Sequence, residues 1–300
     1  MADANDSRFA TLWLRLVRLY TFNFPIDKGK GRIFKFAKRF CRELPGIASV
    51  LTRDGRHIRV GFRDWCDDLI YFLGDYEAFC TEIIRQYIAK DSVCVDAGAN
   101  IGWFTTLFQS VCGKEGEVHA FEPVPMMFEE LEKNVALNAY SENVYLNNLG
   151  LGDEIGDHEM YLFADVPSGH SSLSVGNNSI SATFRVKIIT LDSYISERET
   201  GDIDLVKVDI EGAELMFLKG AVRLFEQKTP PVMLMEMARE TCKAFGNKPN
   251  DLIKFISSKA DYDFFLLDER LQRLRPIEWF DEESPGANVL CVPKGFSPRK

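Results

Sequence analysis

The amino-acid sequence predicts an α/β fold of the doubly wound, Rossmann-like type, a mostly parallel sheet of seven strands with helices on both faces. Short apolar runs alternate with helical patterns from Val93 almost to the end of the chain, and each parallel crossover in such a sheet needs a helix. A glycine-rich turn follows the first apolar run, and acidic residues end several later ones. These features favour a ligand site at the edge where the strands end.

Residues 1–73 are expected to form an N-terminal extension in front of a larger domain over residues 74–300. Apolar side chains recur at helical spacing over residues 7–20, which predicts an amphipathic helix. A basic stretch from Lys28 to Arg42 follows, and residues 49–62 predict a β-hairpin that turns at Arg53-Asp54-Gly55. Residues 76–89 then predict a helix that leads into the first core strand.

The core elements follow from the alternating pattern. Strands are expected at 93–97, 117–121, 143–147, 204–209, 231–236, 262–267 and 288–292, and helices at 103–112, 125–138, 213–226 and 249–259. Since no full helix separates the last two strands, an antiparallel strand is permitted at that edge of the sheet. An insertion at about 153–203 is expected to contain strands at 158–163 and 184–190.

The turn after the first core strand indicates the kind of cofactor. Such a turn brings bare backbone N–H groups and a helix N-terminus up to a ligand. Here Asn100 and Trp103 stand where a dinucleotide-binding turn has its second and third glycines, so a diphosphate has no room. Asn100 can adopt the left-handed conformation that glycine usually supplies. The pattern that remains, Asp96-x-Gly98-x-Asn100-x-Gly102, suits S-adenosylmethionine, which has an ammonium group, a ribose and no phosphate.

Glu122 supports that choice of cofactor. It ends the second core strand, twenty positions after Gly102, where a carboxylate can accept both hydroxyls of a ribose.

Four segments of the sequence resemble a known family, the FkbM-type methyltransferases. They are Val95–Thr105, Ala120–Pro125, Thr190–Tyr194 and Lys207–Glu214, and the resemblance extends from about Gly74 to Lys294. Members of this family are class I enzymes that use S-adenosylmethionine and mostly methylate hydroxyls of sugars and natural products. The resemblance implies the class I methyltransferase form of the predicted sheet.

The resemblance also implies roles for the cofactor residues. Asp96 and the backbone from Gly98 to Gly102 would hold the methionine end of the cofactor, and Glu122 would hold the ribose. Class I enzymes often recognise adenine with a side chain just after the third strand, here within Asn147 to Asp153. Asp153 could accept from the exocyclic amine, or it could serve only the turn at Gly152-Asp153.

Three acidic residues at or after the end of the fourth core strand could take part in the reaction: Asp209, Glu211 and Glu214. Asp209 ends a strand at the ligand-binding edge and could take a proton from an attacking hydroxyl, with Glu211 as a second catalytic candidate. Alternatively, Asp209 and a neighbouring carboxylate could hold Mg²⁺. Glu211 and Glu214 could also simply favour the positive N-terminus of the following helix, or Glu214 could contact the substrate. Lys207 shares a face with Asp209, so an internal ion pair is as plausible for it as substrate contact.

Further candidates match shorter elements of the family. His170-Ser171-Ser172-Leu173 matches a Ser-Ser-Leu element within the insertion, so His170 is a catalytic candidate, with an exposed loop role as the alternative, and Ser171 and Ser172 are substrate candidates. Glu77, in a Tyr-Glu element, is expected to help close the cofactor site. Glu236 ends the fifth strand and would contact the substrate or make a buried hydrogen bond.

Composition and charge limit the partners. The formal net charge is −9, yet residues 1–40 hold nine Lys/Arg against three Asp/Glu, so the body of the chain is strongly acidic. Such a body argues against a nucleic-acid substrate. Seven cysteines without paired spacing favour a reducing compartment, and we expect a cytoplasmic protein without a signal peptide or a membrane span.

These observations predict an S-adenosylmethionine-dependent O-methyltransferase whose acceptor is a small molecule or a glycan. The alternatives are N-methylation of an amine and a non-catalytic cofactor-binding assembly module. The basic amphipathic region over residues 7–42 has two interpretations: peripheral contact with an anionic membrane, or packing on the catalytic domain or on a second copy in a homo-oligomer.

Overall fold

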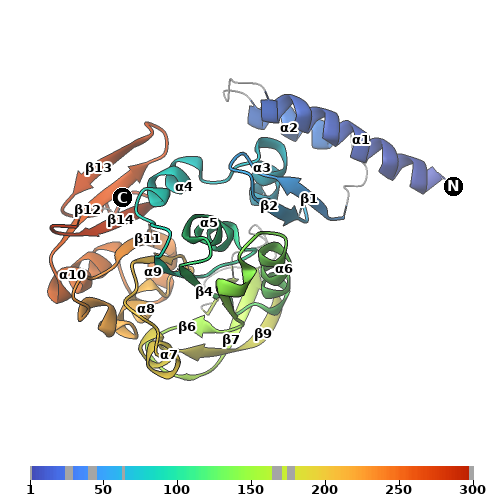
Figure 1. Ribbon diagram of the computed structural model, residues 1–300. Helices are drawn as coiled ribbons and strands as arrows, with labels where there is room; N and C mark the ends of the chain where they lie inside the picture. Colours follow the sequence, from blue (N-terminus) through green and yellow to red (C-terminus); the bar gives the residue numbers. More distant parts are fainter. Residues whose placement is uncertain are drawn as a thin grey trace. The chain divides into compact units, whose positions relative to one another are not determined.

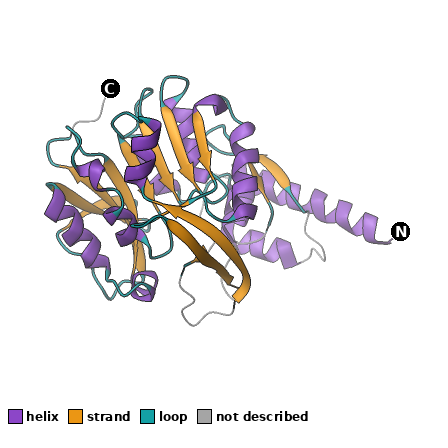
Figure 2. Cartoon of the chain, turned by 90° about the horizontal axis from the view of Figure 1, so that it is seen from below, coloured by secondary structure: helices purple, strands orange, loops and turns teal. Residues whose placement is uncertain are grey.

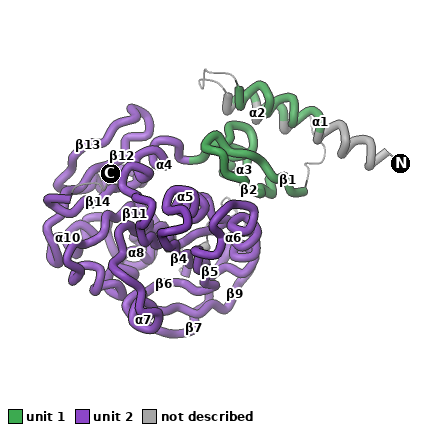
Figure 3. The backbone as a smooth tube through the Cα atoms, viewed as in Figure 1, with its two compact units in different colours: residues 1–76 green, residues 77–300 purple. Residues whose placement is uncertain are grey.

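The computed structural model describes residues 2–23, 30–39, 46–62, 65–163, 171–173 and 180–296. The chain divides into two compact units, residues 1–76 and residues 77–300 (Figure 3). Each unit is described by itself.

In the described part of the first unit, the elements are three helices and a hairpin. Its elements are α1 (Ala2–Asn23), α2 (Lys30–Arg39), β1 (Ala48–Leu51), β2 (His57–Val60) and α3 (Trp65–Leu73). Helix α1 packs against α2 and α3 and buries Leu14, Val17 and Thr21. The amphipathic helix and the hairpin that the sequence predicts are both present, and Gly55 takes a φ of +87° in the hairpin turn. Among the described residues, no helix has both the length and the apolar character of a membrane span.

Within the part of the second unit that the structure describes, eight strands form one central sheet in the order β13-β12-β14-β11-β10-β3-β4-β5 (Figure 1). They are β3 (Val93–Ala97), β4 (Glu117–Phe121), β5 (Val144–Asn147), β10 (Leu205–Val208), β11 (Val232–Ala238), β12 (Tyr262–Asp268), β13 (Arg273–Ile277) and β14 (Gly286–Pro293). The five strands from β11 to β5 are parallel, so the predicted doubly wound sheet is confirmed.

Two details of this sheet differ from the sequence-based prediction. The antiparallel edge strand that the sequence permitted is present, but it is β13, an eighth strand that was not predicted and that pairs with β12. The predicted strand that became β14 is also antiparallel, and it lies between β11 and β12. The segment Arg273–Ile277 is largely exposed and contains Pro276, and proline is tolerated in a strand chiefly at a sheet edge.

Helices cover both faces of the central sheet (Figure 2). On one face, α7, α8 and α10 pack on an apolar core that includes Val95, Val208, Met235 and Val289. Side chains alternate between the faces of a strand, so the residues next to these in sequence point to the opposite face. The helices of the second unit are α4 (Ala78–Arg85), α5 (Trp103–Cys112), α6 (Pro125–Ala136), η1 (Ser141–Asn143), α7 (Leu191–Arg198), α8 (Glu214–Lys219), η2 (Val222–Phe225), α9 (Arg239–Ala244) and α10 (Pro249–Lys259).

The insertion forms a second sheet in the order β6-β9-β7-β8, built from β6 (Gly150–Leu151), β7 (Gly156–Phe163), β8 (Ser171–Ser172) and β9 (Ile180–Ile189). The two strands predicted there are present. The predicted helix over 213–226 is instead α8 followed by the short helix η2, because α8 ends at Gly220, its C-cap residue. A Cβ on Gly220 would lie 2.0 Å from the carbonyl oxygen of Gly152, so close packing requires glycine there.

Candidate active site

The glycine turn lies where the order of the parallel strands reverses. β3 has β4 on one side and β10 on the other, and ligands of doubly wound sheets bind at the carboxyl ends of strands at such a point. Gly98, Asn100 and Gly102 have φ values of +81°, +50° and +92°. The predicted left-handed conformation of Asn100 is therefore confirmed.

Gly98 joins this turn to the end of β10. An ideal Cβ on Gly98 would lie 1.9 Å from the carbonyl oxygen of Asp209, closer than any side chain can approach. In addition, the N–H of Asp209 donates to the carbonyl of Ala97 at 3.0 Å. The cofactor turn and the acidic strand end are thus in direct backbone contact.

Several N–H groups of the turn already have partners. Gly98 and Ala99 both donate to the carbonyl of Phe121 at 3.0 Å, and Gly102 donates to the carbonyl of Ala99. Asn100 donates to Oε2 of Glu122 at 2.8 Å. The expectation that these N–H groups are bare was wrong, because the turn folds back onto the end of β4. A turn of this kind offers little to a diphosphate and fits a cofactor without phosphates.

Glu122 holds the turn in place from the end of β4. Its Oε1 accepts from the N–H of Val124 at 2.8 Å, while Oε2 accepts from Asn100. Burial raises the pKa of Glu122 to about 7, although both backbone N–H groups oppose the change. Each carboxylate oxygen has a second lone pair, so Glu122 can still accept from a ribose hydroxyl.

Asp96 lies near the end of β3, two residues before the first glycine of the turn. It is fully buried, and its Oδ2 accepts from the hydroxyl of Thr105 at 2.6 Å, while Oδ1 has no hydrogen-bond partner. Burial raises the pKa of Asp96, and the nearby ammonium of Lys207 opposes that shift. The predicted role of Asp96 at the methionine end of the cofactor stays a prediction. Strand alternation turns this side chain towards α5, where it binds Thr105, three residues after the glycine turn.

Lys207 and Asp209 form an ion pair at the end of β10. The Nζ of Lys207 lies 2.9 Å from Oδ2 of Asp209 and 4.9 Å from the centre of the Phe104 ring. Burial by itself would lower the pKa of Lys207, but Asp209, Asp96 and Glu77 raise it above its usual value. Lys207 is therefore charged at neutral pH, and the internal ion pair that the sequence permitted is the arrangement found.

Glu236 and Asn288 continue the same face of the sheet on β11 and β14. Glu236 pairs in register with Asn288, and it follows Met235, which pairs with Val208 directly before Asp209. Asn288 donates to Oε2 of Glu77 at 3.3 Å, and Glu77 is the N-cap residue of α4. Burial raises the pKa of Glu236 well above its usual value, and Asp209, Glu211 and Glu214 add to the shift.

We call these side chains together the polar row. It consists of Asp96, Lys207, Asp209, Glu236 and Asn288, with Glu77 at its end.

Glu211 and Glu214 stand in the turn between β10 and α8. Oε1 of Glu214 accepts from the N–H groups of Ile210 and Gly212 at 3.2 and 3.1 Å, while Oε2 is buried without a hydrogen-bond partner. Burial raises the pKa of Glu214 to about 7. Glu214 therefore holds the turn at the start of the helix, and its buried position does not support contact with a substrate. Glu211, with a φ of +56°, stays partly exposed beside Glu236.

Asp153 lies away from the cofactor turn. Its Cα is 3.2 Å from the position that a Cβ on Gly220 would take, at the far end of α8 from Glu214. The chain leaves the central sheet at β6, before Asp153 is reached, so the structure does not support its predicted contact with adenine. Asn148 lies closer, because its Nδ2 donates to the carbonyl of Glu122 at 2.8 Å.

The remaining predicted site residues belong to the insertion. His170 lies outside the described residues. The backbones of Ser171 and Ser172 pair with Leu162 and Tyr161 of β7, so the structure places them in the second sheet rather than in the polar row. Among the residues that the structure describes, no group of three or more His, Cys, Asp or Glu is arranged to hold a metal ion.

Three residues of the site were not predicted from the sequence. Asn288 is the one polar side chain in the segment Ala287–Val292. A polar residue in such an apolar strand indicates a hydrogen bond inside the protein, so this signal could have identified it. Phe104 covers Lys207, and Thr105 binds Asp96. Both follow the glycine turn directly, but sequence spacing alone does not show which side of α5 they occupy.

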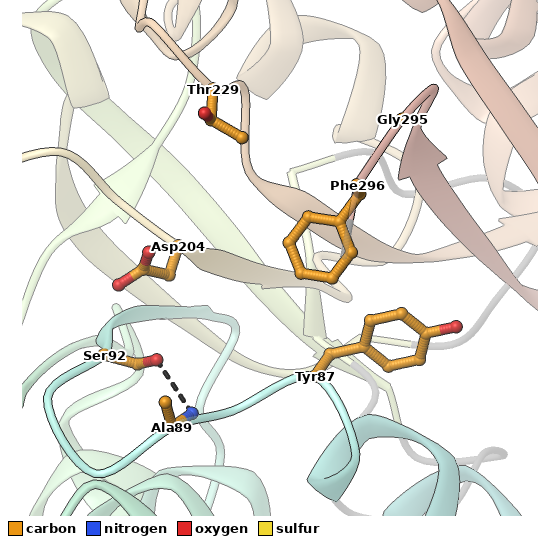
Figure 4. Close-up of a pocket in the computed structure, with 7 residues that line it drawn as sticks. All are labelled: Tyr87, Ala89, Ser92, Asp204, Thr229, Gly295 and Phe296. Carbon is orange, nitrogen blue, oxygen red and sulfur yellow. Dashed lines mark hydrogen bonds between the residues drawn. The ribbon is translucent and has the colours of Figure 1, made fainter. Parts of the chain in front are cut away.

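A separate pocket of about 250 Å³ lies near the amino ends of the parallel strands (Figure 4). The rings of Tyr87 and Phe296, 5.8 Å apart, line it together with Ser92 and Asp204, which directly precede β3 and β10. Because the polar row lies at the carboxyl ends of these strands, this pocket is not part of the candidate site.

Comparisons with known proteins agree with this geometry. Residues 96–264 match the model of the methyltransferase FkbM domain. The hexuronic acid methyltransferase AglP of Haloferax volcanii is 30% identical over 175 residues, which cover 58% of this chain and 65% of that protein. The 31-O-demethyl-FK506 methyltransferase FkbM of Streptomyces tacrolimicus is 26% identical over 155 residues, which cover 43% of this chain and 58% of that protein.

A solved structure, that of methyltransferase FkbM from Methylobacillus flagellatus, is also similar. It aligns with a TM-score of 0.44 and 19% identity over 68% of this chain and 44% of that chain. The matches span between 58% and 65% of the length of the curated relatives.

Proposed function

The chain belongs to the FkbM methyltransferase family, whose cofactor is S-adenosylmethionine, and from this premise we propose that it methylates a hydroxyl of a sugar, a glycan or a natural product. The observation that carries the proposal is the contact between Gly98 and the carbonyl of Asp209. It puts the cofactor turn directly beside the acidic end of β10, so a bound acceptor would meet both.

The cofactor would be held on the side of β3 and β4. Glu122 would accept from the ribose hydroxyls, and Asn148, beside it, is the candidate for the adenine contact. Asp96 would support the cofactor turn through its hydrogen bond with Thr105. When bound, S-adenosylmethionine supplies an electrophilic methyl group on a sulfonium.

The acceptor would be held on the side of β10 and β11. A hydroxyl must lose its proton as the methyl group transfers, and Asp209, about one third exposed, is placed to accept that proton. Lys207 fixes the Asp209 carboxylate with its own ammonium and so orients it. Glu236 would hold a second hydroxyl of the acceptor, because it makes no hydrogen bond or ion pair with the residues described.

The charges of the polar row favour a neutral acceptor. Its carboxylates, together with Glu77 and Glu211, outnumber the ammonium of Lys207. A polyhydroxylated acceptor can bind to such a surface through hydrogen bonds, whereas an anionic one would be repelled. The name of one relative, a 31-O-demethyl-FK506 methyltransferase, supports O-methylation of a polyhydroxylated acceptor as the class to test first. The hexuronic acid named for the other relative carries a carboxylate, so uronic-acid glycans are the second class to test.

The test is a transfer assay with S-adenosylmethionine labelled in its methyl group. The protein is incubated with separate sets of neutral glycans, uronic-acid glycans, polyhydroxylated natural products and amines, and labelled products are identified by mass spectrometry and NMR. We expect a methyl ether, formed by wild type and lost with Asp209→Asn. A labelled methylamine would instead establish N-methylation. Cofactor binding without transfer to any set would favour the non-catalytic module.

A further inference from the structure

Helix α1 of the first unit has apolar side chains on two opposite sides. Leu14, Val17 and Thr21 are buried against the rest of the unit. Successive residues of a helix are rotated by about 100°, so this buried side is narrow and continuous. The internal contacts of the unit therefore account for only one of the two apolar sides.

The second side is a row of large exposed side chains. Leu12, Leu16, Leu19 and Tyr20 follow the spacing of one helix face, and between 47% and 63% of each is exposed. Their mean direction is roughly 150° from that of the buried side. We call these four residues the exposed apolar row. Apolar rows of this kind on a protein surface usually mark an interaction site.

Basic residues accompany the row. Arg15 is exposed beside it on α1, and α2 exposes Phe36 between Arg32 and Arg39. Helix α2 packs on α1, where Nε1 of Trp13 donates to the carbonyl of Ala37 at 3.3 Å.

The sequence over 7–42 contains ten Lys/Arg and a single acid, Asp27, within a chain whose net charge is −9. Positive charge is thus concentrated in the segment that exposes apolar side chains.

We propose that the exposed apolar row and its arginines bind the surface of an anionic lipid bilayer. Leucine and tyrosine side chains would enter the interface, while arginines beside them would meet anionic headgroups. A bilayer accounts for both features, since apolar burial alone would suit any protein surface and basic charge alone would suit any polyanion. The acidic body of the chain would be repelled by the same bilayer, so this segment makes the contact.

This inference does not depend on the proposed function. If both hold, the contact keeps the enzyme near acceptors that are anchored in a membrane.

Vesicle flotation with the full chain tests the proposal. Wild type is mixed with vesicles of phosphatidylglycerol and phosphatidylcholine, or of phosphatidylcholine alone, at low and high salt. We expect wild type to float only with the anionic vesicles and to be released by salt, because salt screens surface charges. Leu16→Asn/Leu19→Asn should lower the bound fraction by about tenfold or more. Arg15→Gln/Arg32→Gln should weaken binding chiefly at low salt.

A matched control separates this site from surface hydrophobicity in general. Leu271 of the second unit is 53% exposed, like Leu16, so Leu271→Asn removes a comparable side chain and should float as wild type does. Circular dichroism and S-adenosylhomocysteine titration verify that each variant is folded.

Three outcomes would overturn the proposal: wild type that does not float, equal flotation of wild type and Leu16→Asn/Leu19→Asn, or equal binding to neutral vesicles. Light scattering completes the test. If wild type fails to float and the leucine variant instead loses a dimer, the row is an interface between two copies of this chain.

Discussion

The two halves of the candidate site stabilise their polar groups in different ways. On the side of β3 and β4, the turn and Glu122 are joined through backbone N–H groups, and the N–H donors of Asn100 and Val124 fix the carboxylate. On the side of β10 and β11, charged side chains lie next to one another. There Lys207 faces Asp209 at 2.9 Å, and the charged neighbours of Glu236 include Asp209, Glu211, Glu214 and the ammonium of Lys207.

Because of this difference, the two halves should tolerate different kinds of substitution. A half built from backbone contacts should be sensitive to an added Cβ and to the loss of Glu122, the carboxylate that accepts from its N–H groups. A half built from side-chain charges should keep its shape when a carboxylate becomes an amide, yet lose its chemistry. Substitutions can therefore separate cofactor binding from methyl transfer.

The largest expected effect is on turnover, in the acidic half. Asp209→Asn keeps the size of the side chain but removes the group that would accept the proton of the acceptor. We expect turnover to fall by about 10²-fold or more, measured as product formed from labelled cofactor at saturating acceptor. Glu211→Gln, in the same turn, is the control and should retain most of the activity. A fully active Asp209→Asn enzyme would remove Asp209 from the chemistry.

The next effect concerns the backbone contact between the halves. Gly98→Ala puts a methyl group against the carbonyl of Asp209 at a positive φ, and it should destabilise the fold by about 3 kcal/mol, measured by urea unfolding. Gly55→Ala is a matched control, because Gly55 has a similar φ of +87° with no atom within 4 Å of the added Cβ. We expect it to cost only about 1 kcal/mol. Equal losses would show that the contact with Asp209 contributes nothing.

The third effect is a pH dependence of stability that Glu214 introduces. Burial raises its pKa to about 7 in the folded protein, above the value of about 4.3 expected in the unfolded chain. A raised pKa gives a contribution that is present at low pH and is lost as the pH rises towards 7. Glu214→Gln resembles the protonated form, so its stability advantage over wild type should grow from about pH 4 and reach about 3 kcal/mol near pH 7. A difference in the free energy of unfolding between Glu214→Gln and wild type that does not change from about pH 4 to 7 would contradict this pKa.

The smallest effect distinguishes two candidates for the adenine contact. Asn148→Ala should weaken binding of S-adenosylhomocysteine by about 1 kcal/mol, the usual net contribution of a hydrogen bond. Asp153→Ala should leave the affinity unchanged, because Asp153 packs beside Gly220 at the far end of α8. Titration calorimetry of both variants checks this. The reverse ranking would restore Asp153 as the adenine residue.

The sequence predicted the parts of the site that depend on local backbone. The glycines and Asn100 impose positive φ values, and the strand that ends at Phe121 places Glu122 beside them. The alternation of side chains along a strand put Lys207 and Asp209 on one face, which allowed either an ion pair or substrate contact, and the ion pair is found. Such features need only the spacing of a few neighbouring residues.

Other parts depend on contacts between distant segments and could not be predicted. The position of Asp153 beside Gly220 is one of them, because the chain turns into the second sheet at Gly150, which sequence spacing does not show. The burial of Asp96 under α5 and the bonding of the turn to Phe121 also arise from tertiary packing. β13 has too little apolar pattern to be recognised before its partner β12 is known.

One calorimetric comparison tests whether cofactor binding and acceptor chemistry belong to separate halves of the site. S-adenosylhomocysteine is titrated into wild type, Glu122→Ala and Asp209→Asn under the same conditions. We expect micromolar affinity for wild type, near −8 kcal/mol by order of magnitude, a loss of about 1.5–3 kcal/mol for Glu122→Ala, and no change for Asp209→Asn. Unchanged affinity in Glu122→Ala, or an equal loss in Asp209→Asn, would contradict this separation.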